Sequence, residues 1–185
     1  MPPALARFFW FLNKFFMVPL FRLGLGPFMG NPFTGYIMVM KVIGRKSGKT
    51  YFVPVNYAIK DGNIYCISGG RRTSDWFRNI MANPKVELIL PGGAIFASAN
   101  ESSDAHKKLI VSRQILKNAG LAGYFEGYNP RKISEEDLQS KVEDLPLLRF
   151  TPQGIGAGAS DPAGWAWISV FVITIAFIWA MIEVL

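Results

Sequence analysis

The longest apolar run of the chain lies near its C-terminus. Residues 164–182 form a stretch of nineteen without a charge, rich in Ile, Val, Phe, Ala and Trp. A helix of that length rises roughly 28 Å at about 1.5 Å per residue, close to the roughly 30 Å of a hydrocarbon core. Trp165, Trp167 and Trp179 lie toward its ends, where interfacial aromatic side chains are enriched. The pattern predicts one transmembrane helix over 164–183.

The N-terminal segment has a different pattern, in which aromatic and basic residues are interleaved. Six aromatic residues fall between Ala4 and Val18, and Arg7 and Lys14 are seven apart, so the two cations share one helix face. This spacing predicts an amphipathic helix lying in a membrane interface, with packing against the domain as the alternative. Glycines and prolines after residue 23 predict an irregular arm. Residues 1–34 therefore form a first unit.

Residues 35–150 show short runs of β-branched and aromatic residues separated by turn signals. Strands are predicted over 36–43, 51–59, 63–68, 86–90 and 94–99, with a final strand over 147–150. Helices are predicted over 74–82, 104–118 and 135–142, and Asp61-Gly62 is a hairpin turn. These elements predict an α+β domain, a small antiparallel barrel with flanking helices. A Gly- and Pro-rich flexible linker is expected over 151–163.

The charge of the chain is concentrated at one end. The net charge is +7, and residues 1–60 contain eight Lys or Arg and no Asp or Glu. An anionic partner is therefore expected, either membrane lipid or a phosphorylated cofactor, and the expected anchor disfavours nucleic acid. The cations precede the predicted span, which places the domain on the cytoplasmic side of a membrane.

Two single residues narrow the function classes. Cys66 is the only cysteine and cannot form an internal disulfide, so a reducing compartment is expected. His106 is the only histidine and lies at a predicted helix start rich in polar residues, so no metal site is predicted. Neither a paired-carboxylate motif nor a nucleophile elbow is present.

Two glycine-containing basic turns are the best candidates for a binding site. The first, Gly44–Lys49, joins two predicted strands and combines two glycines, one hydroxyl and three cations. Such a turn cradles phosphate, although a solvated loop is the alternative. The second, Ser68–Arg72, ends a predicted strand and leads into a short helix. The two turns either hold one anionic ligand from two sides or are unrelated loops.

The segment 44–88 resembles the deazaflavin-dependent nitroreductase family in a combination of motifs. These are the G-R-K-S-G turn, a following strand that contains Pro54, the Asp61-Gly62 hairpin, and the W-x-x-N-x-x-A-N-P pattern from Trp76 to Pro84. The resemblance extends from the N-terminal helix to about Pro152. It implies a split β-barrel of the flavin-reductase type that binds the deazaflavin F420 or, alternatively, FMN.

The resemblance also implies roles for individual residues. The implied cofactor-binding residues are Gly44, Arg45, Lys46, Ser47, Gly48, Pro54, Asn56, Ser68, Gly69, Gly70, Trp76 and Asn79. Tyr124 and Tyr128 resemble the family's tyrosines over the substrate pocket, where a hydroxyl would donate a hydrogen bond or proton to a developing oxyanion. Packing at the barrel mouth is the alternative for both. The second turn is one residue shorter than in relatives, and Asn56 and Phe77 replace aromatic residues found in some of them.

These observations favour a membrane-tethered oxidoreductase. It would transfer hydride from F420, or from FMN, to a lipophilic acceptor such as a quinone. One alternative is a catalytically silent accessory subunit of a larger membrane electron-transfer complex. Another is a lipid- or quinone-binding module without catalysis.

Overall fold

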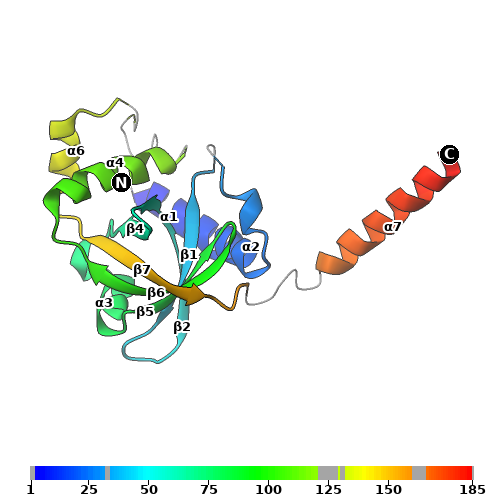
Figure 1. The fold of residues 1–185 in the computed structure, drawn as a ribbon, viewed down its shortest axis with the longest axis horizontal. Coiled ribbons are helices and arrows are strands. Elements are labelled where there is room, and N and C mark those ends of the chain that lie inside the picture. Colours follow the sequence, from blue (N-terminus) through cyan, green and yellow to red (C-terminus); the bar gives the residue numbers. More distant parts are fainter. Residues whose placement is uncertain (1–2, 32–33, 121–128, 130–131, 160–165, 185) are drawn as a thin grey trace.

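A single antiparallel sheet organises the fold (Figure 1). The computed structural model describes residues 3–31, 34–120, 129, 132–159 and 166–184. Seven strands pair in the order β2-β1-β5-β6-β7-β4-β3, and the sheet curls into a half-barrel. The strands are β1 (Ile37–Ile43), β2 (Thr50–Asn56), β3 (Ala58–Lys60), β4 (Asn63–Ile67), β5 (Lys85–Leu90), β6 (Gly93–Glu101) and β7 (Leu147–Ile155). The predicted α+β class is confirmed, and the predicted small antiparallel barrel takes the form of a curled half-barrel of seven strands.

The described residues also form helices, most of them where the sequence predicts a helix. They are α1 (Pro3–Leu12), α2 (Val18–Arg22), α3 (Asp75–Ala82), α4 (Ala105–Asn118), α6 (Glu135–Val142) and α7 (Ala166–Val184), with a π-helical stretch, η1 (Asn13–Met17), and short 3₁₀ turns η2 (Gly26–Phe28) and η3 (Arg71–Thr73). Side chains cap two of the starts: Asp104 accepts from the N–H of Lys107 at 2.9 Å, and Ser134 from that of Asp137 at 3.0 Å. These bonds satisfy N–H groups that a helix leaves free at its first turn.

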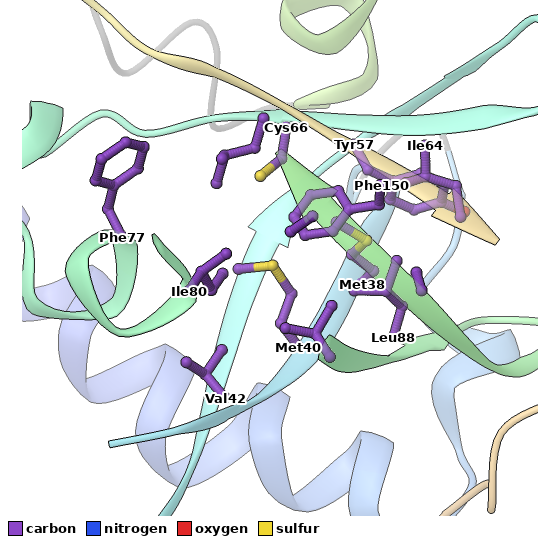
Figure 2. Packing of buried hydrophobic residues seen from close by; sticks show 14 residues of the cluster. Met38, Met40, Val42, Tyr57, Ile64, Cys66, Phe77, Ile80, Leu88 and Phe150 are labelled. Atoms are coloured by element: carbon purple, nitrogen blue, oxygen red, sulfur yellow. The ribbon is translucent and has the colours of Figure 1, made fainter. Parts of the chain in front are cut away.

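Strand alternation sends one set of side chains into the main core (Figure 2). Met38, Met40 and Val42 of β1 point into this core, where they meet Phe150 of β7. Phe77 and Ile80 of α3 close it on one side. Smaller clusters lie under α4 and under α2. The outward set of side chains on β1 and β5 therefore remains for other contacts.

The predicted linker begins too early. The expected strand over 147–150 continues to Ile155, because β6 is nine residues long and β7 pairs along it, from Glu101↔Leu148 to Ile95↔Ile155. Pro152 lies in this ladder opposite Ala97, where the register shifts. A bulge of this kind accommodates a residue that has no N–H to donate.

Two further predictions about the strands and the tail are corrected. The strand predicted over 51–59 is interrupted at Tyr57 and forms β2 and β3. The expected C-terminal helix is present as α7, which begins at Ala166 and ends at Val184. Among the described residues, however, no helix has the length and apolar character needed to cross a membrane, so the predicted transmembrane span is not supported.

Candidate functional site

The first basic turn is built around two glycines. The N–H of Gly44 donates to the carbonyl of Lys49 at 2.9 Å, and that of Gly48 to the carbonyl of Gly44 at 2.8 Å. Gly48 has φ +65°, in the left-handed region that favours glycine. A Cβ on Gly44 would lie 2.6 Å from both the Ser47 hydroxyl and the Tyr51 ring. Both glycines are therefore needed for this turn to close.

Arg45 fastens the turn to α3. Its Nη1 donates to Oδ1 of Asn79 at 2.7 Å, and its Nη2 to Oδ1 of Asp75 at 2.9 Å. The Arg45 backbone N–H also donates to Oδ1 of Asn79, at 3.2 Å. The hydrogen bond and the charge of Arg45 hold the pKa of the Asp75 carboxyl below its usual range. The Asn79 side chain is buried, so this amide is a fixed point that orients the turn.

Other donors of the same turn have no hydrogen-bond partner among the residues that the structure describes. Within the described residues, no acceptor meets the backbone N–H groups of Lys46 and Ser47. The Lys46 ammonium is exposed and makes no described ion pair. Neighbouring free N–H groups beside a cation form the kind of concavity that binds phosphate oxygens. The turn therefore fits the anionic end of a phosphorylated cofactor.

The second basic turn is held differently. The Ser68 hydroxyl donates to the carbonyl of Arg71 at 2.8 Å and lies 3.1 Å from the Ser74 hydroxyl. Arg71 has φ 56°, a left-handed conformation that costs a non-glycine residue free energy. In the part of the chain that is described, the N–H groups of Gly69 and Gly70 have no acceptor. This turn too presents free backbone donors.

α3 brings the two turns together. Asp75 and Asn79 of this helix hold the first turn, and Ser74, its N-cap residue, contacts the second. Trp76 packs against the main core from the same helix. α3 and its N-cap residue therefore lie between the two basic turns, and that the turns hold one ligand from two sides stays a prediction.

Pro54 and Asn56, the two residues of β2 that the sequence predicts as cofactor-binding, lie farther along that strand from the first turn. β2 starts beside that turn at Thr50, which pairs with Ile43, and ends at Asn56, which pairs with Ile37. At about 3.3 Å per residue, Asn56 is roughly 20 Å along the strand from Thr50. Its Nδ2 donates to the carbonyl of Tyr36 at 3.4 Å. A ligand that reached both the first turn and Asn56 would have to extend along β2, past Pro54.

Some site residues lie outside the sequence-based prediction or outside the description. Asp75 and Tyr51 were not predicted; the Tyr51 hydroxyl lies 3.1 Å from that of Ser47. The partnership of Asp75 with Arg45, thirty residues earlier in the chain, leaves no local signal. Tyr124 and Tyr128, the predicted catalytic tyrosines, lie outside the described residues.

Several solved structures resemble this fold. One is an F420-H2 dependent reductase, with 21% identity over 63% of this chain and 93% of that one, at a TM-score of 0.41. A second is a conserved hypothetical protein from Mycobacterium tuberculosis, which is 14% identical over 65% of this chain and 78% of its own, with a TM-score of 0.48. A third is a heme storage protein from Vibrio cholerae, which is 12% identical over 68% of this chain and 89% of its own, with a TM-score of 0.43. No curated protein matches the chain.

A family model matches residues 22–133, a segment that contains both basic turns and α3. The family is described as F420H(2)-dependent quinone reductase. The match confirms the predicted resemblance to F420-dependent proteins, F420 as the cofactor, and a reductase as the class of protein. It covers more than half of the sequence, and the chain belongs to the F420H(2)-dependent quinone reductase family.

Proposed function

We propose that this protein reduces a quinone with F420H2 and holds a phosphate group of the cofactor on the first basic turn. The observation that supports this most strongly is that the N–H groups of Lys46 and Ser47, beside the Lys46 ammonium, meet no acceptor among the described residues. When bound, F420H2 would supply a hydride to the acceptor. The residues of the chain bind and orient the cofactor and act on the acceptor oxygen.

Arg45 has a positioning role in this proposal. Its guanidinium is engaged by Asn79 and Asp75, so it orients the turn and adds positive charge without itself gripping a phosphate. The donors of Lys46 and Ser47 are thus preorganised before the cofactor arrives. Preorganisation raises affinity because less ordering remains to be done on binding. Gly69 and Gly70 supply further N–H groups from the other side of α3.

The acceptor side of the reaction is assigned to tyrosines. We propose that the hydroxyl of Tyr124 or Tyr128 donates a hydrogen bond or proton to the quinone oxygen as negative charge develops there. General acid catalysis of this kind contributes about a hundredfold or more. Replacing the residue that acts, by Tyr→Phe, should lower kcat by that order and leave F420 affinity unchanged. If neither substitution changes kcat, the tyrosines have no catalytic role.

The binding proposal is tested by titrating F420 fluorescence against wild-type protein and the Lys46→Gln variant. A charge-assisted contact contributes about 1.5–3 kcal/mol, so the variant should bind F420 about ten- to a hundredfold more weakly. Lys117→Gln removes an exposed lysine at the end of α4 and is the matched control. Equal affinities of Lys46→Gln and Lys117→Gln would place the phosphate elsewhere.

The reaction itself is tested with F420H2 and menadione, by following the oxidation of F420H2. Wild-type protein should accelerate that oxidation in the presence of the quinone, and the rate should saturate with menadione. Binding of F420 without turnover of any quinone would contradict the reductase proposal and leave the binding proposal intact.

A further inference from the structure

A hollow lies on the outer face of the sheet, away from the main core. Lys41, Glu87 and Phe96 form one row across three strands, in the pairs Lys41↔Glu87 and Glu87↔Phe96. Their neighbours on each strand point into the core, so this row points outward. The hollow measures about 490 Å³ and also reaches Ile43 and Lys85. It includes no residue of the two basic turns.

An ion pair forms the floor of this hollow. Nζ of Lys41 donates to Oε2 of Glu87 at 2.7 Å and to the carbonyl of Gly158 at 3.3 Å. The other oxygen of Glu87 accepts from the N–H of Gly158 at 3.1 Å. Both oxygens of the carboxylate are therefore engaged, whereas an ammonium has three N–H donors and two have partners here. Lys41 keeps one donor for a ligand.

The wall and rim of the hollow combine apolar surface with free donors. Phe96 is 47% exposed and Ile43 36%, so both present apolar surface to solvent. Among the described residues, the side chains of Lys85, Thr50 and Gln153 meet no hydrogen-bond or ion-pair partner. The charged residues that line the hollow are Lys41, Lys85 and Glu87, so its net charge is about +1. Its volume lies within the range of small-molecule sites.

We propose that this hollow is a second ligand site, which takes an aromatic monoanion such as an aryl carboxylate. The ring would rest on Phe96, because an exposed aromatic face stacks favourably with another ring. The anionic head would accept from Lys85 and from the remaining donor of Lys41, while Thr50 and Gln153 offer neutral donors. Because Glu87 is fully paired, it does not oppose the anion as a free carboxylate would. The site adjoins the first basic turn, because Ile43 and Thr50 stand on either side of Gly44–Lys49, but it includes none of the residues of that turn.

The probe for this site is 1-naphthoate, and 1-naphthamide is its uncharged counterpart. Calorimetric titration of the full chain should show that naphthoate binds at least about tenfold more tightly than the amide, since only the anion makes charge-assisted bonds. Lys85→Gln and Phe96→Ser should each weaken naphthoate binding by about tenfold. Lys85 is exposed and its ammonium meets no partner in the described part of the chain, so its substitution should not disturb the fold.

Lys46→Gln and Lys117→Gln are the matched controls and should bind naphthoate like the wild type. Saturating F420 should leave naphthoate affinity unchanged, because the two sites share no residue. Absence of naphthoate binding at millimolar concentration would overturn the proposal, as would equal binding by Lys85→Gln or by the amide. Loss of binding in Lys46→Gln, or competition with F420, would instead place the anion on the first basic turn.

Discussion

The two basic turns, Gly44–Lys49 and Ser68–Arg72, both combine glycine with arginine but differ in what holds the arginine side chains. The Arg45 side chain is 22% exposed and is fixed by the buried amide of Asn79 and by Asp75. The side chains of Arg71 and Arg72 are both 64% exposed and pair with surface acids, Asp144 and Glu101. Hydrogen bonds to a buried amide hold an arginine side chain in one conformation, whereas an arginine in an exposed ion pair moves readily between conformations and partners. A cation in a glycine turn is therefore not by itself a ligand contact.

The largest expected effect comes from removing the buried anchor of the first turn. Asn79→Ala deletes the acceptor for two N–H groups of Arg45, and unsatisfied buried donors cost about 1–3 kcal/mol. The free energy of unfolding should fall by that amount in urea titrations, and F420 affinity should fall with it because the turn loses its orientation. Gln139→Ala, at an exposed position of α6, is the control and should change neither. Unchanged F420 affinity in a destabilised Asn79→Ala would separate the anchor from the binding site.

A smaller effect is expected when the charge of Arg45 is kept but its shape is changed. Arg45→Lys retains one cation and loses the planar fork that reaches Asn79 and Asp75 together. Loss of about one net hydrogen bond lowers the free energy of unfolding by about 0.5–1.5 kcal/mol. F420 affinity should fall severalfold although the formal charge is unchanged. If Arg45→Lys binds F420 like the wild type, charge alone accounts for the contribution of Arg45.

The second turn should lose less stability than the first when one of its arginines is replaced, even when the charge is removed as well. Arg72→Gln removes an exposed pair with Glu101, and such pairs contribute about 0.2–1 kcal/mol. Urea titration should therefore give a smaller loss than for Arg45→Lys, and the loss should shrink further at high salt. A loss as large as that of Asn79→Ala would show that the two turns are held with similar strength.

Local signals in the sequence predicted the parts of the fold that depend on neighbours in the chain. The Asp61-Gly62 hairpin lies between β3 and β4, and Ser134 caps α6 as the motif indicates. Residues 151–155 were assigned to a linker because glycine and proline there are typical of one. The pairing that makes them part of β7 is set by the length of β6, whose paired residues lie 53 to 60 positions earlier in the chain, from Thr151↔Ser98 to Ile155↔Ile95. No local pattern in 151–155 reports this pairing.

In the candidate site, too, local features were predictable from the sequence and contacts between distant segments were not. The glycines and cations of the first turn are local, so a motif located them. Arg45 is held by hydrogen bonds, whereas the Lys46 ammonium has no partner among the described residues. This difference depends on Asp75 and Asn79, which come from a helix distant in the sequence. The hollow on the outer face depends likewise on Gly158 meeting Lys41 and Glu87. Residue types showed which groups are charged, and tertiary contacts decide which charges remain available.

The smallest expected effect concerns the charge of Asp75, the acid that pairs with Arg45. Arg45 lowers the pKa of Asp75 below its ordinary value of 3.8 through a hydrogen bond and its charge. A lowered pKa in the folded protein contributes stability that is present above the ordinary value and lost as pH falls through the folded value. Asp75→Asn keeps an oxygen acceptor for Arg45 and removes only the charge. The stability difference between wild type and Asp75→Asn should therefore be constant above about pH 5 and shrink below about pH 4.

Urea titrations of both proteins across that range measure the difference directly. Asp75 is exposed, so solvent screens the pair and the difference should also diminish as salt is added. Asp137→Asn provides the comparison at another helix start, where the carboxyl accepts from the Ser134 hydroxyl and no arginine of the described residues pairs with it. A wild type that is less stable than Asp75→Asn above about pH 5 would mean that the charge of Asp75 destabilises the fold. In that case Asn79 alone holds Arg45, and the first turn depends on one buried amide.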